Sequence, residues 1–212
     1  MTTIQLTPAA GSDDGFWRED TSAFGTTGAF STGNYSGLGS INGFVRFADA
    51  LSELPAGATI TAASLALVAY TSRSGTVCRL RIRAVAADDP AAPTTYAEVE
   101  GAPRTTASTY WEPPATTADL GYNSPDFAAV VQEIVDRPGW ASGQHLLIYI
   151  EDDGSDGSAR RQWHAQDTGF APVLTVEFEV VPPPPPPPPP PAAGTRFADW
   201  RFEVDTGAGF VA

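Results

Sequence analysis

The sequence predicts an all-β fold: a jelly-roll-type β-sandwich with one short α-helix at about 124–137. Three observations predict it. Only 17% of the residues are charged, whereas glycine, alanine, serine and threonine are abundant, as in a β-rich fold with many turns. Apolar and polar residues alternate with a period of two in several segments. A single segment has instead the spacing of an amphipathic helix.

The first strands are expected after a segment rich in turns. Residues 12–43 contain many glycines with aromatic residues between them, which favours short strands joined by ordered loops. One strand is predicted at 44–48, and a second strand, after a Pro-Ala-Gly turn, ends at Tyr70.

An arginine row marks the next strand, in the segment 77–85. Cys78, Leu80, Ile82 and Ala84 fall on one face, and Arg79, Arg81 and Arg83 fall on the other. The arginines would stand about 7 Å apart. We expect them to pair with carboxylates across the sheet. The alternative is a protein interface, in which arginine is enriched.

The helix has a start signal, an apolar stripe and a stop signal. Ser124 is expected to be the N-cap, with Pro125 at the first helical position and Asp126 in the first turn. A Pro-Gly pair at 138–139 ends the helix. The apolar stripe consists of Phe127, Val130, Val131, Ile134 and Val135.

Two further strands follow the helix. The segment 145–150, "HLLIYI", is predicted to be a core strand. In the segment 171–180, Leu174, Val176 and Phe178 alternate with polar or smaller residues, which predicts a strand with one buried face.

Composition excludes several classes of function. The net charge of −13 argues against nucleic acid and anionic membranes as partners, because both need clustered cations. Cys78 is the only cysteine, so neither a disulfide framework nor a cysteine metal site is expected. No signal peptide and no membrane-spanning run is visible. No metal and no cofactor is predicted.

Two long segments resemble a known family. The stretch "FVRFADALSELPAGATITAASLALVAY" resembles the strand pair of DNRLRE-type β-sandwich domains, and "SPDFAAVVQEIVDRPGWASGQHLLIYI" is similar to their helix-to-strand segment. "APVLTVEFEV" is similar to the closing strand, so the resemblance covers residues 12–180. It implies a non-catalytic module related to carbohydrate-binding modules and found on bacterial surface proteins and phage virion proteins.

Candidate catalytic and metal sites are weak. His164 with Asp167 suggests a triad, but no serine on a G-x-S-x-G elbow accompanies them, so no catalytic residue is assigned. The acidic segment 151–158 could attract calcium, but its spacing departs from the EF-hand pattern and fits a polar loop between two strands.

Aromatic residues are the candidates for glycan binding, since sugar rings stack on exposed aromatic faces. Tyr110 and Trp111 are expected to form an exposed pair in a long loop, and Trp163 is a further candidate, whereas Trp140 is expected in the core. The alternative for Trp111, beside two prolines, is that it covers the core.

The C-terminal segment predicts contact with another molecule. The domain 1–181 is followed by ten prolines at 182–191, which favour a polyproline II rod of about 31 Å. The β-like tail 192–212 alternates apolar and charged residues but is too short to bury its aromatics alone. It should therefore add to a sheet edge or fill a groove, on this domain folded back, on a neighbouring copy or on a different protein. The length of the proline rod favours a neighbour. The predicted partner-binding residues are Phe197, Trp200, Phe202, Val204 and Phe210.

These observations together predict a non-enzymatic structural protein of a phage particle, a capsid decoration, cement or surface appendage protein located on the virion surface. Its expected partners are other virion proteins and copies of itself, with host glycan as a further ligand. The N-terminal strand "TTIQL" is expected to join the contacts between chains. The alternative is a carbohydrate-binding or adhesion module of a secreted or cell-surface protein. A fragment of a glycan-degrading enzyme lacks a paired-carboxylate motif.

Overall fold

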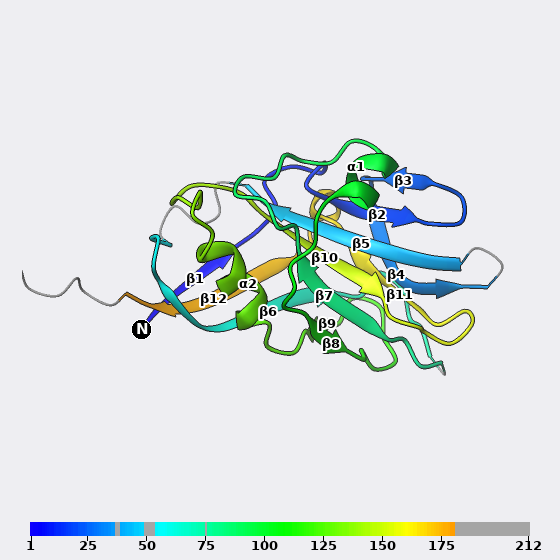
Figure 1. The fold of residues 1–212 in the computed structure, drawn as a ribbon. Coiled ribbons are helices and arrows are strands. Elements are labelled where there is room, and N and C mark those ends of the chain that lie inside the picture. The colour runs from blue at the N-terminus through cyan, green and yellow to red at the C-terminus, as the bar shows by residue number, and fades with distance from the viewer. Residues whose placement is uncertain (37–38, 49–53, 75, 181–212) are drawn as a thin grey trace, which may run out of the picture. The chain divides into compact units, whose positions relative to one another are not determined.

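Two antiparallel β-sheets pack face to face in the computed structural model of the protein (Figure 1). The structure describes residues 1–36, 39–48, 54–74 and 76–180. The predicted all-β class and sandwich are confirmed. The chain divides into the units Met1–Val181 and Pro182–Ala212, and the second unit, with the proline run and the tail, lies outside the described residues.

Sheet A contains four strands and closes one side of the core. In spatial order they are β1 (Thr2–Leu6), β12 (Val173–Glu179), β6 (Thr59–Val68) and β9 (Gly121–Asn123). Along β12, Leu174, Val176 and Phe178 are buried between more exposed neighbours, which confirms the predicted alternation. The N-terminal strand is therefore paired within the domain, along the whole of β1.

Sheet B is larger and is forked. In spatial order its main path is β11 (Arg160–His164), β4 (Ala29–Tyr35), β5 (Gly39–Phe47), β10 (Leu146–Asp152), β7 (Leu80–Ala84) and β8 (Thr109–Trp111). A second arm consists of β2 (Asp14–Arg18) and β3 (Ala23–Gly25). Both arms start from β5, because Ile41 pairs with Gly33 of β4 and with Arg18 of β2.

Small residues allow the two arms to share β5. A Cβ atom at Gly43 would lie 2.9 Å from atoms of Phe30 and Thr32, so β4 crosses close beneath β5 only because residue 43 has no side chain. The far side of β11 is closed as well, since Trp163 forms an isolated bridge with Ala69 just after β6. The two sheets are thus joined at this edge.

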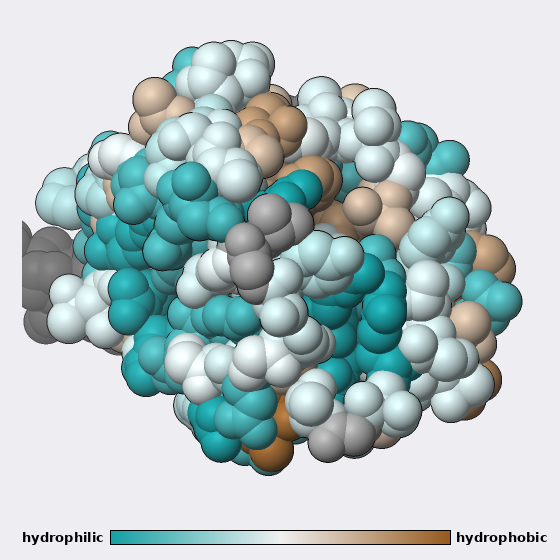
Figure 2. Space-filling view, turned by 90° about the vertical axis from the view of Figure 1, so that its right-hand side faces the viewer, coloured by the Kyte–Doolittle hydropathy of each residue, from teal (hydrophilic) through white to brown (hydrophobic). Residues whose placement is uncertain are grey.

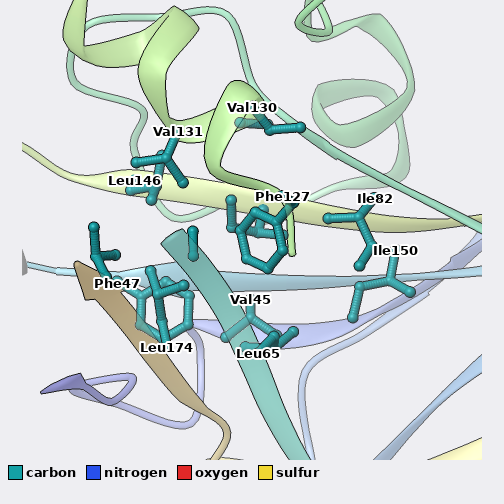
Figure 3. Packing of buried hydrophobic residues seen from close by; sticks show 14 of the residues in the cluster. Val45, Phe47, Leu65, Ile82, Phe127, Val130, Val131, Leu146, Ile150 and Leu174 are labelled. Atoms are coloured by element: carbon teal, nitrogen blue, oxygen red, sulfur yellow. The ribbon is translucent and has the colours of Figure 1, made fainter. Parts of the chain in front are cut away.

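The core lies between the sheets and is completed by a helix. Figure 3 shows Leu65 and Leu174 of sheet A near Val45 of sheet B. Helix α2 (Ala128–Val135) packs against β6 and β7, and the five predicted stripe residues are all buried. Trp140 is buried, as predicted. A second cluster, which includes Trp17 and Tyr149, covers part of sheet B beneath the short helix α1 (Tyr96–Gly101).

The helices differ from the prediction in two ways. α2 begins four residues later than Ser124, because the Ser124 hydroxyl accepts the Leu65 N–H of β6 at 2.9 Å instead of capping the helix. α1 was not predicted. Its signal is a capping box, in which Thr95 accepts the Glu98 N–H and Glu98 accepts the Thr95 N–H. A 3₁₀ turn, η1, spans Gln166–Thr168.

Candidate functional site: an arginine-lined cleft

A cleft of about 330 Å³ opens where the two arms of sheet B separate. Its lining comes from four strands: Phe16 and Arg18 of β2, Ala29, Ser31 and Tyr35 of β4, Ile41 of β5, and Arg160 and Gln162 of β11. Figure 2 looks onto the end of the domain at which β2 and β4 finish, and hydrophilic side chains (teal) gather near the middle of this face. We call this hollow the arginine cleft.

Strand pairing places the residues of the arginine cleft. Arg160 and Gln162 are two residues apart on β11, so they share one face, while Arg161 and Trp163 take the other. Gln162 lies opposite Ser31, and Arg160 lies opposite Gly33. Gly33 has φ +107°, and a Cβ atom there would lie 2.3 Å from the carbonyl oxygen of Ala159. Glycine is therefore required where β4 approaches β11.

Both arginines of the cleft lining, Arg18 and Arg160, lie near an aromatic ring. The Arg160 guanidinium carbon is 4.1 Å from the centre of the Tyr35 ring, a cation–π distance. The Arg18 guanidinium carbon is 5.8 Å from the centre of the Phe16 ring. The two rings thus pack against the guanidinium groups of Arg18 and Arg160.

The arginines of the cleft lack carboxylate partners. Six of the ten arginines among the described residues form ion pairs with Asp or Glu: Arg46, Arg79, Arg81, Arg83, Arg104 and Arg137. Within the described ranges, Arg18, Arg73, Arg160 and Arg161 form none. Arg161 is buried and donates to backbone carbonyls, including that of Pro114 at 2.8 Å. Arg18 and Arg160 line the arginine cleft, and Arg73 lies beside it, where it donates to the side-chain oxygen of Gln162.

The electrostatics of the cleft favour an anion. Burial lowers the pKa of the Arg160 guanidinium, and the nearby charges of Arg73 and Arg18 lower it further, although Tyr35 acts in the opposite direction. The Nε atoms of Arg18 and Arg73 are buried without a hydrogen-bond partner. Three cations are thus held together in an acidic protein without a neutralising carboxylate. A bound anion would relieve this repulsion.

The outward face of β11 continues beyond the arginine cleft. The side-chain oxygen of Gln162 accepts hydrogen bonds from Thr71, at 2.9 Å, and from Arg73. Two residues further on, the ring of His164 contacts Tyr70 and Phe170 at centroid distances of 5.0 and 4.7 Å. Both aromatic side chains are nearly half exposed. Polar and aromatic groups therefore follow one strand face over about 13 Å.

His164 is held by Asp119 rather than by the predicted Asp167. Its Nε2 lies 3.1 Å from Asp119 Oδ1, and its Nδ1 lies 2.8 Å from the Thr168 hydroxyl. That hydroxyl donates to the carbonyl of Ala165 at 2.7 Å, inside the 3₁₀ turn. Because its proton is engaged in the turn, Thr168 is not arranged as an activated nucleophile. Asp167 instead accepts the Gly28 N–H.

The predicted aromatic candidates lie on opposite faces of β8. Tyr110 is exposed and donates to Glu112 at 2.7 Å, whereas Trp111 is only 4% exposed. The expectation of an exposed Tyr110–Trp111 pair is therefore wrong for Trp111, because Trp111 lies opposite buried Leu80 of β7. Trp163 is fully buried and stacks on Trp111 at 5.5 Å. Glycan binding at Tyr110 stays a prediction.

The arginine row pairs with the acidic loop, as predicted. Arg79 binds Asp156 at 2.9 Å, and Arg81 binds Asp153 at 2.6 Å. Glu151 lies 3.1 Å from Arg104, and Asp152 accepts the Ser40 hydroxyl at 2.8 Å. Among the described residues, no group of three or more His, Cys, Asp or Glu side chains could hold a metal ion. No helix in these ranges is long and apolar enough to cross a membrane.

The residues of the arginine cleft were not predicted from the sequence. Alternation in "RRQWH" places Arg160 and Gln162 on one face, but no local signal brings Arg18 or Tyr35 beside them. These residues lie side by side only because β5 pairs with both β2 and β4, which forms the fork of sheet B. The predicted tail residues Phe197, Trp200, Phe202, Val204 and Phe210 lie outside the described residues.

A comparison with known proteins finds neither a family model nor a curated protein that matches the chain. The interpretation of the site therefore depends on its own geometry.

Proposed function

We propose that this protein is a non-enzymatic binding module whose arginine cleft binds an acidic glycan. The observation that carries the proposal is that Arg18 and Arg160 in the cleft lining, and Arg73 beside them, have no carboxylate partner among the described residues. Guanidinium groups bind carboxylates and sulfates through paired N–H donors. The ring of Tyr35 and the side chains of Ser31 and Gln162 add an apolar face and hydrogen-bonding groups for a sugar.

The strand order supports the finer proposal of a jelly roll. With β2, β3, β4 and β11 set aside as additions, eight strands remain, and each pairs with its counterpart from the other end of the chain. These pairs are β1 with β12, β5 with β10, β6 with β9, and β7 with β8. An antiparallel ribbon rolled into two sheets has this pairing. We propose that this jelly roll is related to the DNRLRE-type domains that the sequence resembles. The fold alone does not define the function, because sandwiches with this architecture have many different functions.

Retardation in polysaccharide gels tests glycan binding. We expect polygalacturonate or chondroitin sulfate in the gel to slow the native protein and neutral dextran to leave it unaffected. Salt near 0.15 M limits the repulsion from the surrounding acidic surface, since the Debye length is then about 8 Å. Arg160→Ala should weaken binding about tenfold or more, because one charge-assisted contact contributes about 1.5–3 kcal/mol.

Arg79→Ala is the matched control. It removes the same charge from an arginine that directly precedes β7, is paired with Asp156 and does not line the cleft. Its binding should stay within about twofold of that of the native protein. Equal losses in both variants, or no retardation by either acidic polysaccharide, would contradict the proposal.

The second candidate is the structural protein of a phage particle, a decoration or cement protein on the virion surface. It is favoured by the strand-like tail that ten prolines separate from β12. Other virion proteins and further copies of the chain would be its partners. Deletion of residues 182–212 tests it by sedimentation: we expect the intact chain to self-associate and the shortened chain to do so much less. Equal self-association would exclude a role for the tail.

A further inference from the structure

The strand edges of the sandwich differ in how well they are protected. An exposed strand edge presents unpaired N–H and C=O groups, and natural proteins limit such edges by shortness, charge, proline or cover. β3, β8 and β9 are three residues long each. β11 is longer, but its free side is bridged at Trp163 to Ala69. Among the described residues, these four edges are therefore short or covered.

β1 is the exception. It is five residues long, it pairs with β12 along its whole length, and no other described strand pairs with its second side. Its sequence, Thr-Thr-Ile-Gln-Leu, contains neither a charged residue nor a proline. Ile4 is buried and Leu6 is partly buried, whereas Thr3 and Gln5 are exposed. The edge is thus regular and uncharged, with an apolar inner face and a polar outer face.

The tail of this chain has the matching pattern. In the segment 196–205, Trp200, Phe202 and Val204 alternate with Arg201, Glu203 and Asp205. A strand added beside β1 would place the three apolar side chains next to Ile4 and Leu6 and the charged ones next to Thr3 and Gln5. This arrangement extends the buried face of sheet A and keeps the charges in water.

Chain length decides which copy supplies the tail. β12 is the immediate neighbour of β1, so a chain leaving β12 is one strand spacing, about 5 Å, from β1 and about 10 Å from the position beyond it. The ten prolines at 182–191 favour an extended stretch of about 31 Å. This length exceeds the distance needed for a return to the same edge, and it suits a second molecule.

We infer that the open edge of β1 accepts residues 196–205 from a second copy of this chain by β-strand addition. The inference goes beyond glycan binding and names the partner surface for the second candidate function. Because each copy has one tail and one acceptor edge, the contact is heterologous. It closes as a pair when two copies exchange tails, and it continues into larger rings or filaments when each tail binds a further copy.

Disulfide trapping between full-length variants tests the contact. Thr3→Cys is mixed in turn with Arg201→Cys, Glu203→Cys or Asp205→Cys under mild oxidation, and at least one mixture should give a covalent dimer, because paired cysteines need Cα atoms within about 7 Å. Cys78 is fully buried and should not interfere. Thr106→Cys, which replaces an exposed threonine between α1 and β8, is the matched control and should give no dimer.

Sedimentation of the full chain provides an independent measurement. Phe202→Glu places a charge on the inner face of the added strand and should weaken self-association about tenfold or more. Arg201→Glu, on the outer face, should change it much less. If no mixture exceeds the control in trapping, or if Phe202→Glu associates as well as the native chain, the inference is wrong.

The two proposals fail separately. Phe202→Glu should leave retardation by polygalacturonate unchanged, and Arg160→Ala should leave sedimentation unchanged. A double variant that carries both Thr3→Cys and Glu203→Cys tests the choice of copy. A disulfide between these two cysteines within single molecules, in place of dimers, would show that the tail returns to its own edge and would overturn the choice of a second copy.

Discussion

Asp14 provides a quantitative test of the folded structure. Its side chain is fully buried, one carboxyl oxygen accepts the Gln166 N–H at 2.7 Å, and the other oxygen has no hydrogen-bond partner. Burial raises the pKa of Asp14 from the usual 3.8 to about 7, and the nearby carboxylates of Asp167 and Asp13 contribute to the rise, although the Gln166 hydrogen bond opposes it. We predict that Asp14→Asn stabilises the domain progressively as the pH increases from 4 to 8.

The sign follows from proton binding. Below pH 3.8 the Asp14 carboxyl is protonated in both the folded and the unfolded chain, so it contributes no pH dependence. Between pH 4 and 7 the unfolded chain loses this proton while the folded chain keeps it, so the free energy of unfolding falls. A difference of about three pKa units corresponds to about 4 kcal/mol. Asparagine does not titrate, so the Asp14→Asn variant does not show this fall in the free energy of unfolding.

Urea unfolding of both proteins at pH 4 and pH 8, followed by tryptophan fluorescence, measures the effect. The stability difference between Asp14→Asn and the native protein should increase by about 3 to 4 kcal/mol from pH 4 to pH 8. The free-energy cost of burying the asparagine amide is the same at both pH values, so it cancels when the two stability differences are subtracted. The control is Asp89→Asn: the His145 N–H lowers the pKa of Asp89, so its change should be small and opposite in sign. A change below about 1 kcal/mol for Asp14→Asn would refute the reasoning.

Three further predictions concern the same domain. Burial raises the pKa of the Cys78 thiol to about 11, so a disulfide reagent at pH 8 should label it only after unfolding, and rapid labelling of the native protein would contradict its burial. Gly33→Ala should lower the free energy of unfolding by about 2 to 5 kcal/mol in urea, because φ +107° and the contact with Ala159 exclude a side chain. Asp13→Ala leaves the buried Arg46 guanidinium without its partner at 2.8 Å and should cost about 3 to 5 kcal/mol by the same measurement, whereas a loss under 1 kcal/mol would show that Arg46 finds other partners.

Elements with a long regular pattern were predictable from the sequence. In β7 and β12 the alternation alone identified the buried faces, because a strand against a core must place every second side chain inward. The apolar stripe from Phe127 to Val135 likewise identified α2 and its buried face. The pairing of the arginine row with carboxylates was also predictable, since a row of cations in an acidic sheet needs partners across the strands.

Short elements were not predictable with the same accuracy. β8 is three residues long, so Tyr110 and Trp111 showed no repeat that would separate an inward from an outward side chain. Ser124 has the chemistry of an N-cap, but its hydroxyl bonds to the backbone of β6, a tertiary contact that no local pattern reveals. α1 carried a readable signal in its capping box at Thr95 and Glu98.

The arginine cleft could not be predicted because it depends on contacts far apart in the sequence. Arg18 and Arg160 are brought together by the pairing of β5 with two different strands at Ile41. That fork requires the missing side chain of Gly43 and the left-handed backbone of Gly33. The sequence shows two glycines there, among many others in the same segment, and gives no reason to prefer them.

The antiparallel pairing of β1 with β12 also has a practical consequence for engineering. Thr2 lies opposite Phe178, so the chain enters and leaves the sandwich at the same end, as Figure 1 shows for the N-terminus and the end of β12. Domains with adjacent ends tolerate insertion into a loop of a host protein. The sandwich could therefore be inserted into a host as a cassette. The cleft end, where β2 and β4 finish, would then face away from the host.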